Sequence, residues 1–255
     1  MEQRCFFELS YSGKAYAGWQ IQPRVNTVQE TIQDGISKLF SNRSINVVGC
    51  GRTDTGVHAT KYYLHVDLPN RFENDQLRYK LNKILPSDIA IHNVIQVKPD
   101  AHARFDAISR TYIYKINTFK NPFLNDLSWF YPVPLDLNKM NAAALHLLGK
   151  KDFTSFSRLH TDVRTNICEV TEAYWEELEN GDLIFKISAN RFLRNMVRAV
   201  VGTLVDVGRG KTTSNSVKEI LLVKNRSAAG TSAPAHGLYL SDVSYEYINR
   251  TQVID

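Results

Sequence analysis

The chain has 255 residues, 43% of them hydrophobic, and its 31 lysines and arginines against 26 aspartates and glutamates leave a net charge of +5. This composition excludes an intrinsically disordered chain, and the length suits one large domain or two modest ones. No apolar run is long enough to span a bilayer, and the three cysteines lack the paired spacing of a zinc ribbon or a disulfide framework.

The N-terminal stretch "MEQRCFFELSYSG" lacks the long apolar core of a secretory signal. Isolated cysteines also suit a reducing compartment. We therefore expect a cytoplasmic protein that is not inserted in a membrane.

The first half of the chain predicts the order strand, helix, strand, strand, helix, strand. One helix follows Thr27, which forms a capping-box pattern with Glu30, and the other begins at Asn74. The expected strands are 5–11, 45–50, 61–68 and 88–97. This order is that of a split βαβ unit of the ferredoxin-like or RRM-like kind.

The second half predicts a similar but longer order of elements. Strands are expected over 109–118, 166–178, 182–189 and 237–247, and helices over 138–149, 191–208 and 214–224. We therefore predict an α+β fold of two similar RRM-like or ferredoxin-like halves with mainly antiparallel sheets. The predicted boundary divides the chain into 1–106 and 107–255.

The stretch "CGRTDTGVHA" (50–59) places an aspartate, Asp54, on a turn between two expected strands. An aspartate beside glycine commonly caps its own backbone in an Asx-turn, but Arg52 and His58 flank this one and favour a functional role. A metal site formed by Cys50, Asp54 and His58 would mix soft and hard ligands at an unfamiliar spacing. We predict no metal.

A second concentration of polar residues is "DAHARFDAISRTYIYKI" (100–116). Arg110, Tyr112 and Tyr114 recur at every second position, so they should project from one face of a strand. Tyrosines and an arginine on one sheet face form a platform that suits nucleobases and phosphates. An ordinary half-buried strand is the alternative, since tyrosine is common in strands.

Basic residues concentrate in the rest of the second half. On the helix expected over 191–208, Arg194 and Arg198 lie four residues apart, at the margin of one broad apolar face. Arg158 and Arg164 lie in a basic, aromatic segment, 151–165. Clustered positive charge favours a phosphate-rich ligand, and a solvated helix face is the alternative. The basic residues between 191 and 226 are Arg191, Arg194, Arg198, Arg209, Lys211, Lys218, Lys224 and Arg226.

Six motifs in the same order resemble those of the tRNA pseudouridine synthase A family. They are "YSGKAYAGWQIQP", "GRTDTGVHA", "ARFDAISRTYIY", "DFTSFS", "FLRNMVRAVVGTLVDVG" and "GLYLSDVSY", and together they span almost the whole chain. The usual family form of the second motif has alanine where this chain has Thr55, a small change beside the aspartate that should not remove activity.

The resemblance implies an isomerase that converts uridine to pseudouridine at positions 38, 39 and 40 of tRNA, in the anticodon arm. It implies no organic cofactor or metal, and a homodimer with a large catalytic cleft between the halves. By motif, Asp54 is the catalytic aspartate, Tyr112 packs on the target base, Arg198 pairs with the aspartate, and Arg52 helps to hold the flipped nucleotide. Further tRNA contacts are expected from Arg104, Phe105, Arg110, Arg158, Arg164 and Arg194.

Elementary chemistry agrees with these roles but leaves alternatives open. A carboxylate near a breaking glycosidic bond acts as a nucleophile or as a stabiliser. The sequence does not decide whether Asp54 attacks the sugar carbon or removes a proton from it. An RNA-binding module without chemistry would share the basic surface. A hydrolytic glycosidase or nucleosidase would need a second carboxylate nearby, and we interpret the one candidate, Asp106, as structural.

Overall fold

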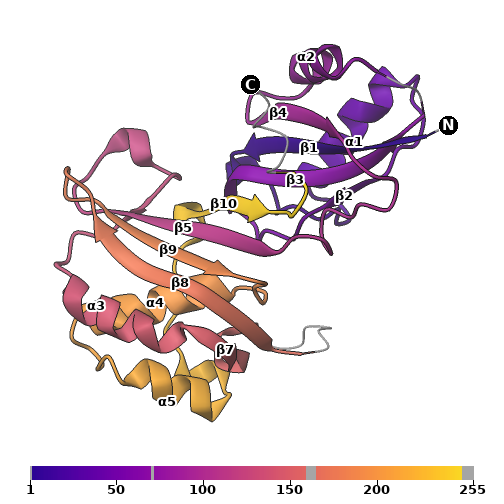
Figure 1. The fold of residues 1–255 in the computed structure, drawn as a ribbon. Helices are drawn as coiled ribbons and strands as arrows, with labels where there is room; N and C mark the ends of the chain where they lie inside the picture. Colours follow the sequence, from indigo (N-terminus) through magenta and orange to yellow (C-terminus); the bar gives the residue numbers. More distant parts are fainter. Residues whose placement is uncertain (1, 70–71, 159–164, 249–255) are drawn as a thin grey trace, which may run out of the picture. The chain divides into compact units, whose positions relative to one another are not determined.

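A computed structural model describes residues 2–69, 72–158 and 165–248 (Figure 1). The described residues group into two compact units. The first contains those within 1–108 and 240–255, and the second contains 109–239. The last part of the chain described by the structure therefore groups with the N-terminal unit.

The first unit contains every strand and helix that the sequence predicts for the first half. Its elements are β1 (Gln3–Tyr11), α1 (Val28–Leu39), β2 (Val47–Gly49), β3 (His58–Leu68), α2 (Asn74–Ile84) and β4 (Ile89–Gln96). The strand order is β4-β1-β3, with β2 also beside β3, and these pairs are antiparallel. This is the order that a split βαβ unit requires.

Apolar and polar residues alternate only weakly along β1, and the burial of the strand explains this pattern. Phe6, Phe7 and Leu9 are all 0% exposed, so β1 is buried on both faces. On one face, Phe6 lies edge-on to Tyr245, with 5.4 Å between ring centroids. The two helices contact each other and the sheet, and α1 begins where predicted, with the Thr27 hydroxyl accepting from the Glu30 amide at 3.4 Å.

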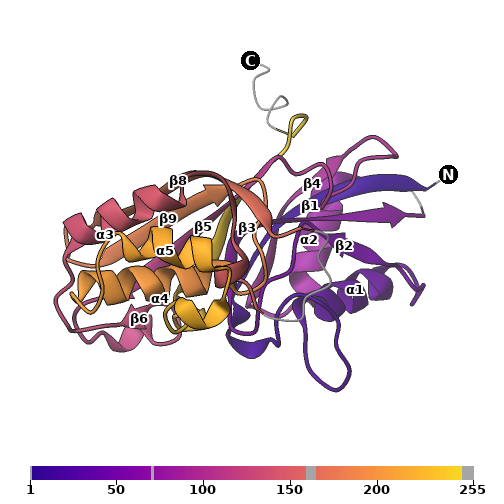
Figure 2. The ribbon, with the colours of Figure 1, turned by 90° about the horizontal axis from the view of Figure 1, so that it is seen from below.

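The second unit is built on the antiparallel order β5-β9-β8-β7, with the two-residue β6 parallel to β5. Its helices lie on one face of this sheet in both views (Figures 1 and 2). Its elements are β5 (Ser109–Asn117), β6 (Trp129–Phe130), α3 (Leu137–Ala144), β7 (Gly149–Asp152), β8 (Ile167–Glu177), β9 (Leu183–Ala189), α4 (Met196–Gly208) and α5 (Ser216–Val223).

The sequence did not predict β6 or β7, which are short and have no clear alternation. The last strand, β10 (Leu238–Ser244), begins in the second unit and ends in the first, where it neighbours β3. The ion pair between Lys61 of β3 and Asp242 of β10, at 2.9 Å, belongs to the first unit. Mixed α and β structure with mainly antiparallel strands confirms the predicted α+β class.

Helix α4 differs from its prediction in two ways. It begins at Met196 rather than near Arg191, because Asn195 adopts a left-handed conformation (φ 65°) that a continuous helix does not allow. Arg194 therefore lies before the helix, and the expectation that it shares the margin of a helix face with Arg198 was wrong. The helix is also buried nearly all round rather than on one face, so other segments must cover its second side.

Candidate active site

The Asp54 turn joins β2 to β3. The Val57 amide donates to the Asp54 carbonyl at 3.1 Å, and Gly56 takes a positive φ of 77°. A glycine is the residue that such a turn requires at this position, because a side chain would be strained there. The Asp54 side chain is half-buried, and Arg52 is exposed.

A neighbouring loop fixes the backbone on the N-terminal side of Asp54. The Trp19 amide donates to the Thr53 carbonyl at 3.2 Å, and the Thr53 hydroxyl lies 2.8 Å from the hydroxyl of Tyr11. Gly18 approaches so closely that a Cβ there would lie 2.5 Å from the Thr53 carbonyl oxygen. The turn is therefore packed against β1 and the loop that follows it.

Three aromatic rings support this turn. Trp19 stacks on Tyr62, with 4.2 Å between centroids and 27° between planes, and Tyr11 meets Tyr62 edge-on at 5.6 Å. The Tyr62 hydroxyl donates to the Gly51 carbonyl. Sequence reasoning assigned no role to these rings, although Tyr11 and Trp19 lie in the first family-like motif.

His58, which flanks Asp54 in sequence, has a structural role. It is 1% exposed, and its Nδ1 accepts from the Gly13 amide at 3.1 Å. Within residues 2–69, 72–158 and 165–248, no three His, Cys, Asp or Glu side chains are grouped so that they could hold a metal ion. In the same ranges, no helix has the length and apolar character needed to cross a membrane.

Tyr112 lies on β5 in the second unit and is half-buried, with Phe192 edge-on to its ring at 5.1 Å. Arg110, on the same strand, donates from Nη1 to the Asn190 carbonyl at 3.0 Å. Tyr114 differs from its prediction: it is 0% exposed and its hydroxyl donates to the Pro234 carbonyl at 2.8 Å. Burial raises its pKa, and its ring belongs to the core rather than to a stacking platform.

Arg198 is half-buried on α4. It is held by residues 229–234, which we name the strap. Its Nε donates to the Ala233 carbonyl at 2.7 Å, and the Ala233 amide donates to the Arg198 carbonyl at 2.9 Å. The strap also covers the second side of α4, where a Cβ on Gly202 would lie 1.7 Å from the Thr231 carbonyl oxygen. The guanidinium is therefore oriented through Nε.

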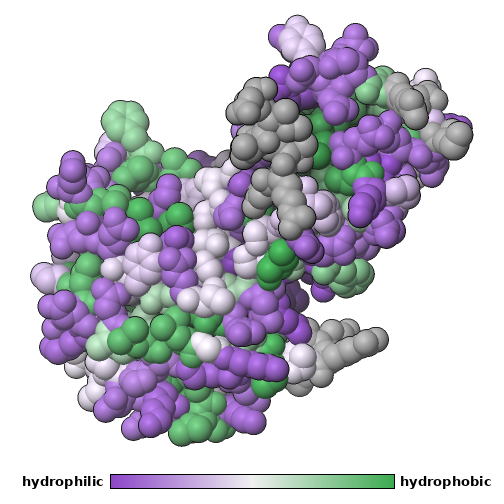
Figure 3. Space-filling model, viewed as in Figure 1, coloured by the Kyte–Doolittle hydropathy of each residue, from purple (hydrophilic) through white to green (hydrophobic). Residues whose placement is uncertain are grey.

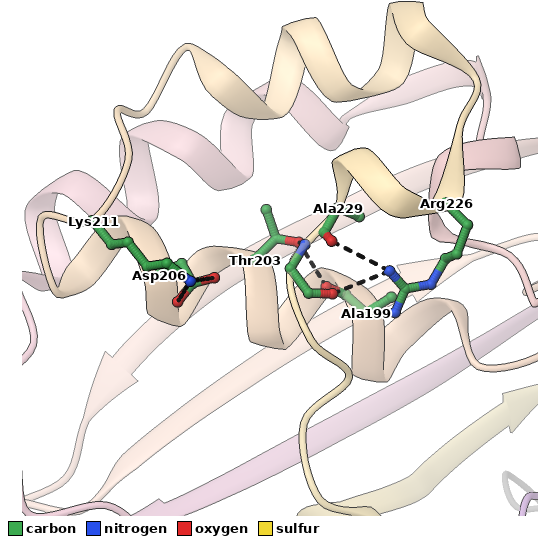
Figure 4. Close-up of polar contacts among 7 residues, drawn as sticks. Ala199, Thr203, Asp206, Lys211, Arg226 and Ala229 are labelled. Carbon is green, nitrogen blue, oxygen red and sulfur yellow. Dashed lines mark hydrogen bonds and ion pairs between the residues drawn. The ribbon is translucent and has the colours of Figure 1, made fainter.

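Further hydrogen bonds anchor the start of the strap (Figure 4). Arg226 donates to the Ala229 and Gly230 carbonyls at 3.4 and 3.1 Å. It also donates to the Ser232 hydroxyl at 2.9 Å, a bond that the figure does not draw. The Gly230 amide donates to the Thr203 hydroxyl, which itself donates to the Ala199 carbonyl. Arg226, one of the clustered basic residues, is therefore a structural clamp.

Two of the other clustered cations form ion pairs at the surface. Lys211 pairs with Asp206 at 3.3 Å, and Lys224 pairs with Asp152 at 3.0 Å. Arg194 is exposed, and its carbonyl accepts from the amide of Arg158, which is exposed as well, at 3.0 Å. These two arginines thus come from segments that lie side by side. Arg164 lies outside the described residues.

Arg104 and Phe105 are exposed on a loop of the first unit. The predicted residues therefore fall into two groups. Asp54, Arg52, Arg104 and Phe105 belong to the first unit, and Tyr112, Arg198, Arg110, Arg158 and Arg194 belong to the second. The predicted pairing of Asp54 with Arg198 joins the two units and stays a prediction.

The two units define an α+β protein that combines a packed, carboxylate-bearing turn with exposed arginines and aromatic rings, a combination typical of enzymes that act on nucleic acids. The family model described as tRNA pseudouridine synthase matches residues 9–106 and 143–246. The chain belongs to that family, which confirms the resemblance and the enzyme class predicted from the motifs.

Relatives named tRNA pseudouridine synthase A match along nearly their whole length. The protein from Porphyromonas gingivalis is 50% identical over 245 residues, covering 95% of this chain and 97% of its own. The one from Bacteroides fragilis is 48% identical over 244 residues, covering 95% and 96%. The one from Bacillus subtilis is 39% identical over 241 residues, covering 93% and 97%.

Proposed function

We propose that this protein converts uridine to pseudouridine at positions 38, 39 and 40 in the anticodon arm of tRNA. The observation that carries the proposal is the family match, which includes the Asp54 turn within residues 9–106. The packing of that turn supports it, because a reactive carboxylate has to be held in a defined position to act on a sugar carbon.

The reaction breaks the bond between N1 of uracil and the sugar carbon and forms a new bond from C5 to that carbon. A proton leaves C5, and one is gained at N1. Asp54 assists by attacking the sugar carbon or by removing a proton from it. In our proposal the ring of Tyr112 packs on the target base, which has to leave its stack to be rearranged.

Arg198 keeps Asp54 ionised and oriented in this proposal, since a nearby cation favours the charged form of a carboxylate. The contact of Nε with the Ala233 carbonyl supports this role. Because the guanidinium group is planar, the bond from Nε to the strap also restricts the orientation of its Nη groups. Arg52 holds the flipped nucleotide, and the exposed arginines 104, 158 and 194 contact phosphates.

We further propose that the protein acts in the cytoplasm as a homodimer. Hydrophilic and apolar side chains are interspersed on the visible face of the second unit (Figure 3). Exposed apolar residues around β6 support a partner surface, and sedimentation analysis tests it. They are Phe119, Phe123, Leu127, Phe130 and Val133.

The geometry weighs against a hydrolase. Asp106, the candidate second carboxylate, accepts from the His102 amide at 2.7 Å and from the Tyr247 hydroxyl at 2.9 Å through Oδ2. These bonds support the structural role predicted for it. An RNA-binding module without chemistry stays the second candidate, because the exposed arginines serve either function.

The deciding experiment incubates the protein with unmodified tRNA and maps pseudouridine by chemical modification and primer extension. We expect product at positions 38 to 40, with the Asp54→Asn protein as the inactive control. Tight binding without product would favour the binding module, and release of free uracil would favour a hydrolase. Binding should weaken steeply with salt, because arginines that meet phosphates release counterions.

A further inference from the structure

The loop between β4 and β5 is fixed by side chains from distant parts of the first unit. The Ala103 amide donates to Nδ1 of His65, on β3, at 3.1 Å, and its carbonyl accepts from the Tyr245 hydroxyl. Arg4, on β1, donates to the Ala101 carbonyl at 3.1 Å while it pairs with Asp67 at 2.7 Å. The backbone at residues 101–103 is therefore held by three separate segments.

The same loop is closed on itself by His102 and Asp106. The Asp106 carboxylate accepts from the His102 amide, and the Asp106 amide donates to the His102 carbonyl at 3.0 Å. The His102 ring turns toward the loop, where its Nδ1 accepts from the amides of Arg104 and Phe105 at 3.1 and 3.3 Å. The loop therefore has a defined backbone up to residue 105.

That residue is Phe105, whose side chain is 75% exposed. The His102 ring lies behind it, with 4.2 Å between ring centroids, and the Arg104 guanidinium carbon lies 5.8 Å from its centroid. An exposed phenylalanine alone needs no explanation. A ring on an anchored backbone, backed by an imidazole and flanked by a cation, is the arrangement that stacks on nucleobases beside a phosphate.

We propose that Phe105 stacks on a base of the tRNA and that His65 is the positioning residue that holds its loop in place. This inference rests on the proposed function, since it takes tRNA as the substrate. His65 acts through the Ala103 amide and does not touch the RNA. As a stacking residue, Phe105 contributes to tRNA affinity rather than to the chemical step.

The environment of His65 suits an acceptor. It is 5% exposed, and its ring stacks near Phe6, at 6.2 Å, and lies edge-on to His102, at 4.6 Å. Burial, with Arg4 and His102 nearby, lowers the pKa of His65 to about 4 against the opposing effect of Asp67 and Asp106. At neutral pH the ring is therefore uncharged, and Nδ1 keeps the lone pair that the Ala103 amide needs.

The stacking half of the proposal is tested by equilibrium binding of unmodified tRNA. Phe105→Ala should weaken binding about ten-fold, and Phe105→Trp should retain it, with tryptophan fluorescence quenched on binding relative to the wild type. The matched control is Tyr79→Ala, which removes a 63% exposed ring with a lysine, Lys83, 5.4 Å from its centroid. Equal binding by Phe105→Ala and the wild type, or equal losses in both variants, would overturn the proposal.

The positioning half is tested with two variants of His65. His65→Asn keeps an acceptor near the place of Nδ1 and should retain the wild-type KM, whereas His65→Leu should raise KM about five-fold with kcat unchanged. His92→Leu is the control, because His92 lies on β4 of the same unit, away from the Phe105 loop, and bonds the Ser10 hydroxyl at 2.7 Å. If His65→Leu behaves like His92→Leu, the positioning role is wrong.

A double substitution separates this role from a general loss of structure. If His65 acts through Phe105, His65→Leu should add no further loss of tRNA affinity to Phe105→Ala, and it should reduce the quenching in Phe105→Trp. Additive losses would contradict the proposal. Should His65→Leu fail to fold, His65→Ala, which also removes the acceptor, takes its place in both backgrounds. Binding without pseudouridine formation would refute the proposed function and leave the stacking result standing.

Discussion

The two units hold their proposed catalytic residues in different ways. In the first unit, two main-chain hydrogen bonds fix the carbonyls of Thr53 and Asp54. In the second unit, the strap holds the Arg198 side chain, through Nε, as well as its backbone. Asp54→Asn keeps these main-chain bonds and the size of the side chain, whereas replacing Arg198 removes a bond to the strap and should loosen it.

The largest effect is expected from Asp54→Asn, which keeps the size of the side chain and removes its charge. Pseudouridine formation should be abolished and tRNA affinity should stay within a few-fold. The melting temperature should change little, because asparagine keeps the size of the side chain and the main-chain bonds of the turn remain. Asp75→Asn, on the exposed start of α2, is the control. Retained turnover would remove Asp54 from the mechanism, and circular dichroism checks the fold.

Arg198→Met should lower the rate of product formation about 100-fold or more, the scale seen when one preorganised donor is removed from an active site. Unlike Asp54→Asn, it should also cost about 1–3 kcal/mol of stability, because the Ala233 carbonyl loses its partner. Single-turnover kinetics and urea unfolding measure the two effects. Arg209→Met, which removes an exposed arginine just after the same helix, should change neither.

Tyr112 allows a finer test than Asp54 or Arg198, because its ring and its hydroxyl can be removed separately. Tyr112→Leu should lose the stacking contribution, about 1–3 kcal/mol. Tyr112→Phe should bind tRNA normally but form little product, since some base has to remove the proton that remains on C5. Binding and single-turnover assays distinguish the two. Full activity of Tyr112→Phe would leave water or Asp54 as that base.

The smallest effect on activity at neutral pH is expected from His65, which changes how stability depends on pH and sharpens the contrast between the units. His65 has a folded pKa of about 4, below its usual 6.5, so the unfolded chain binds the extra proton first as the pH falls. The contribution of neutral His65 to the free energy of unfolding is complete above pH 6.5. About 3 kcal/mol of it is lost as the pH falls toward 4.

Hydrogen exchange measured between pH 7 and 4 should show that the first unit opens before the second, because His65 and His102, whose pKa is also lowered, both lie in it. His65→Asn should reduce the pH dependence in the first unit and leave the second unchanged. Equal acid sensitivity in the two units would contradict this assignment.

Local patterns predicted most of the elements correctly. Helix α1 starts after Thr27 because its cap is made by residues three positions apart, and the strands of the first unit follow from runs of apolar residues. The start of α4 was missed because nothing in the pattern around Leu193 and Met196 indicates that Asn195 turns left-handed. The burial of Tyr114 was missed because alternation shows which residues share a face but not what covers it.

The sequence by itself determined the family, the α+β class and the identity of the proposed catalytic residues, because these depend on short motifs and on periodicity within single elements. Only the tertiary structure decided which contacts hold these residues in position. Segments tens of residues away supply Tyr11 and Trp19 behind Thr53, the strap over α4 and the distant anchors of the loop at Phe105. Their contacts depend on how the sheet brings those segments together, which no local pattern encodes.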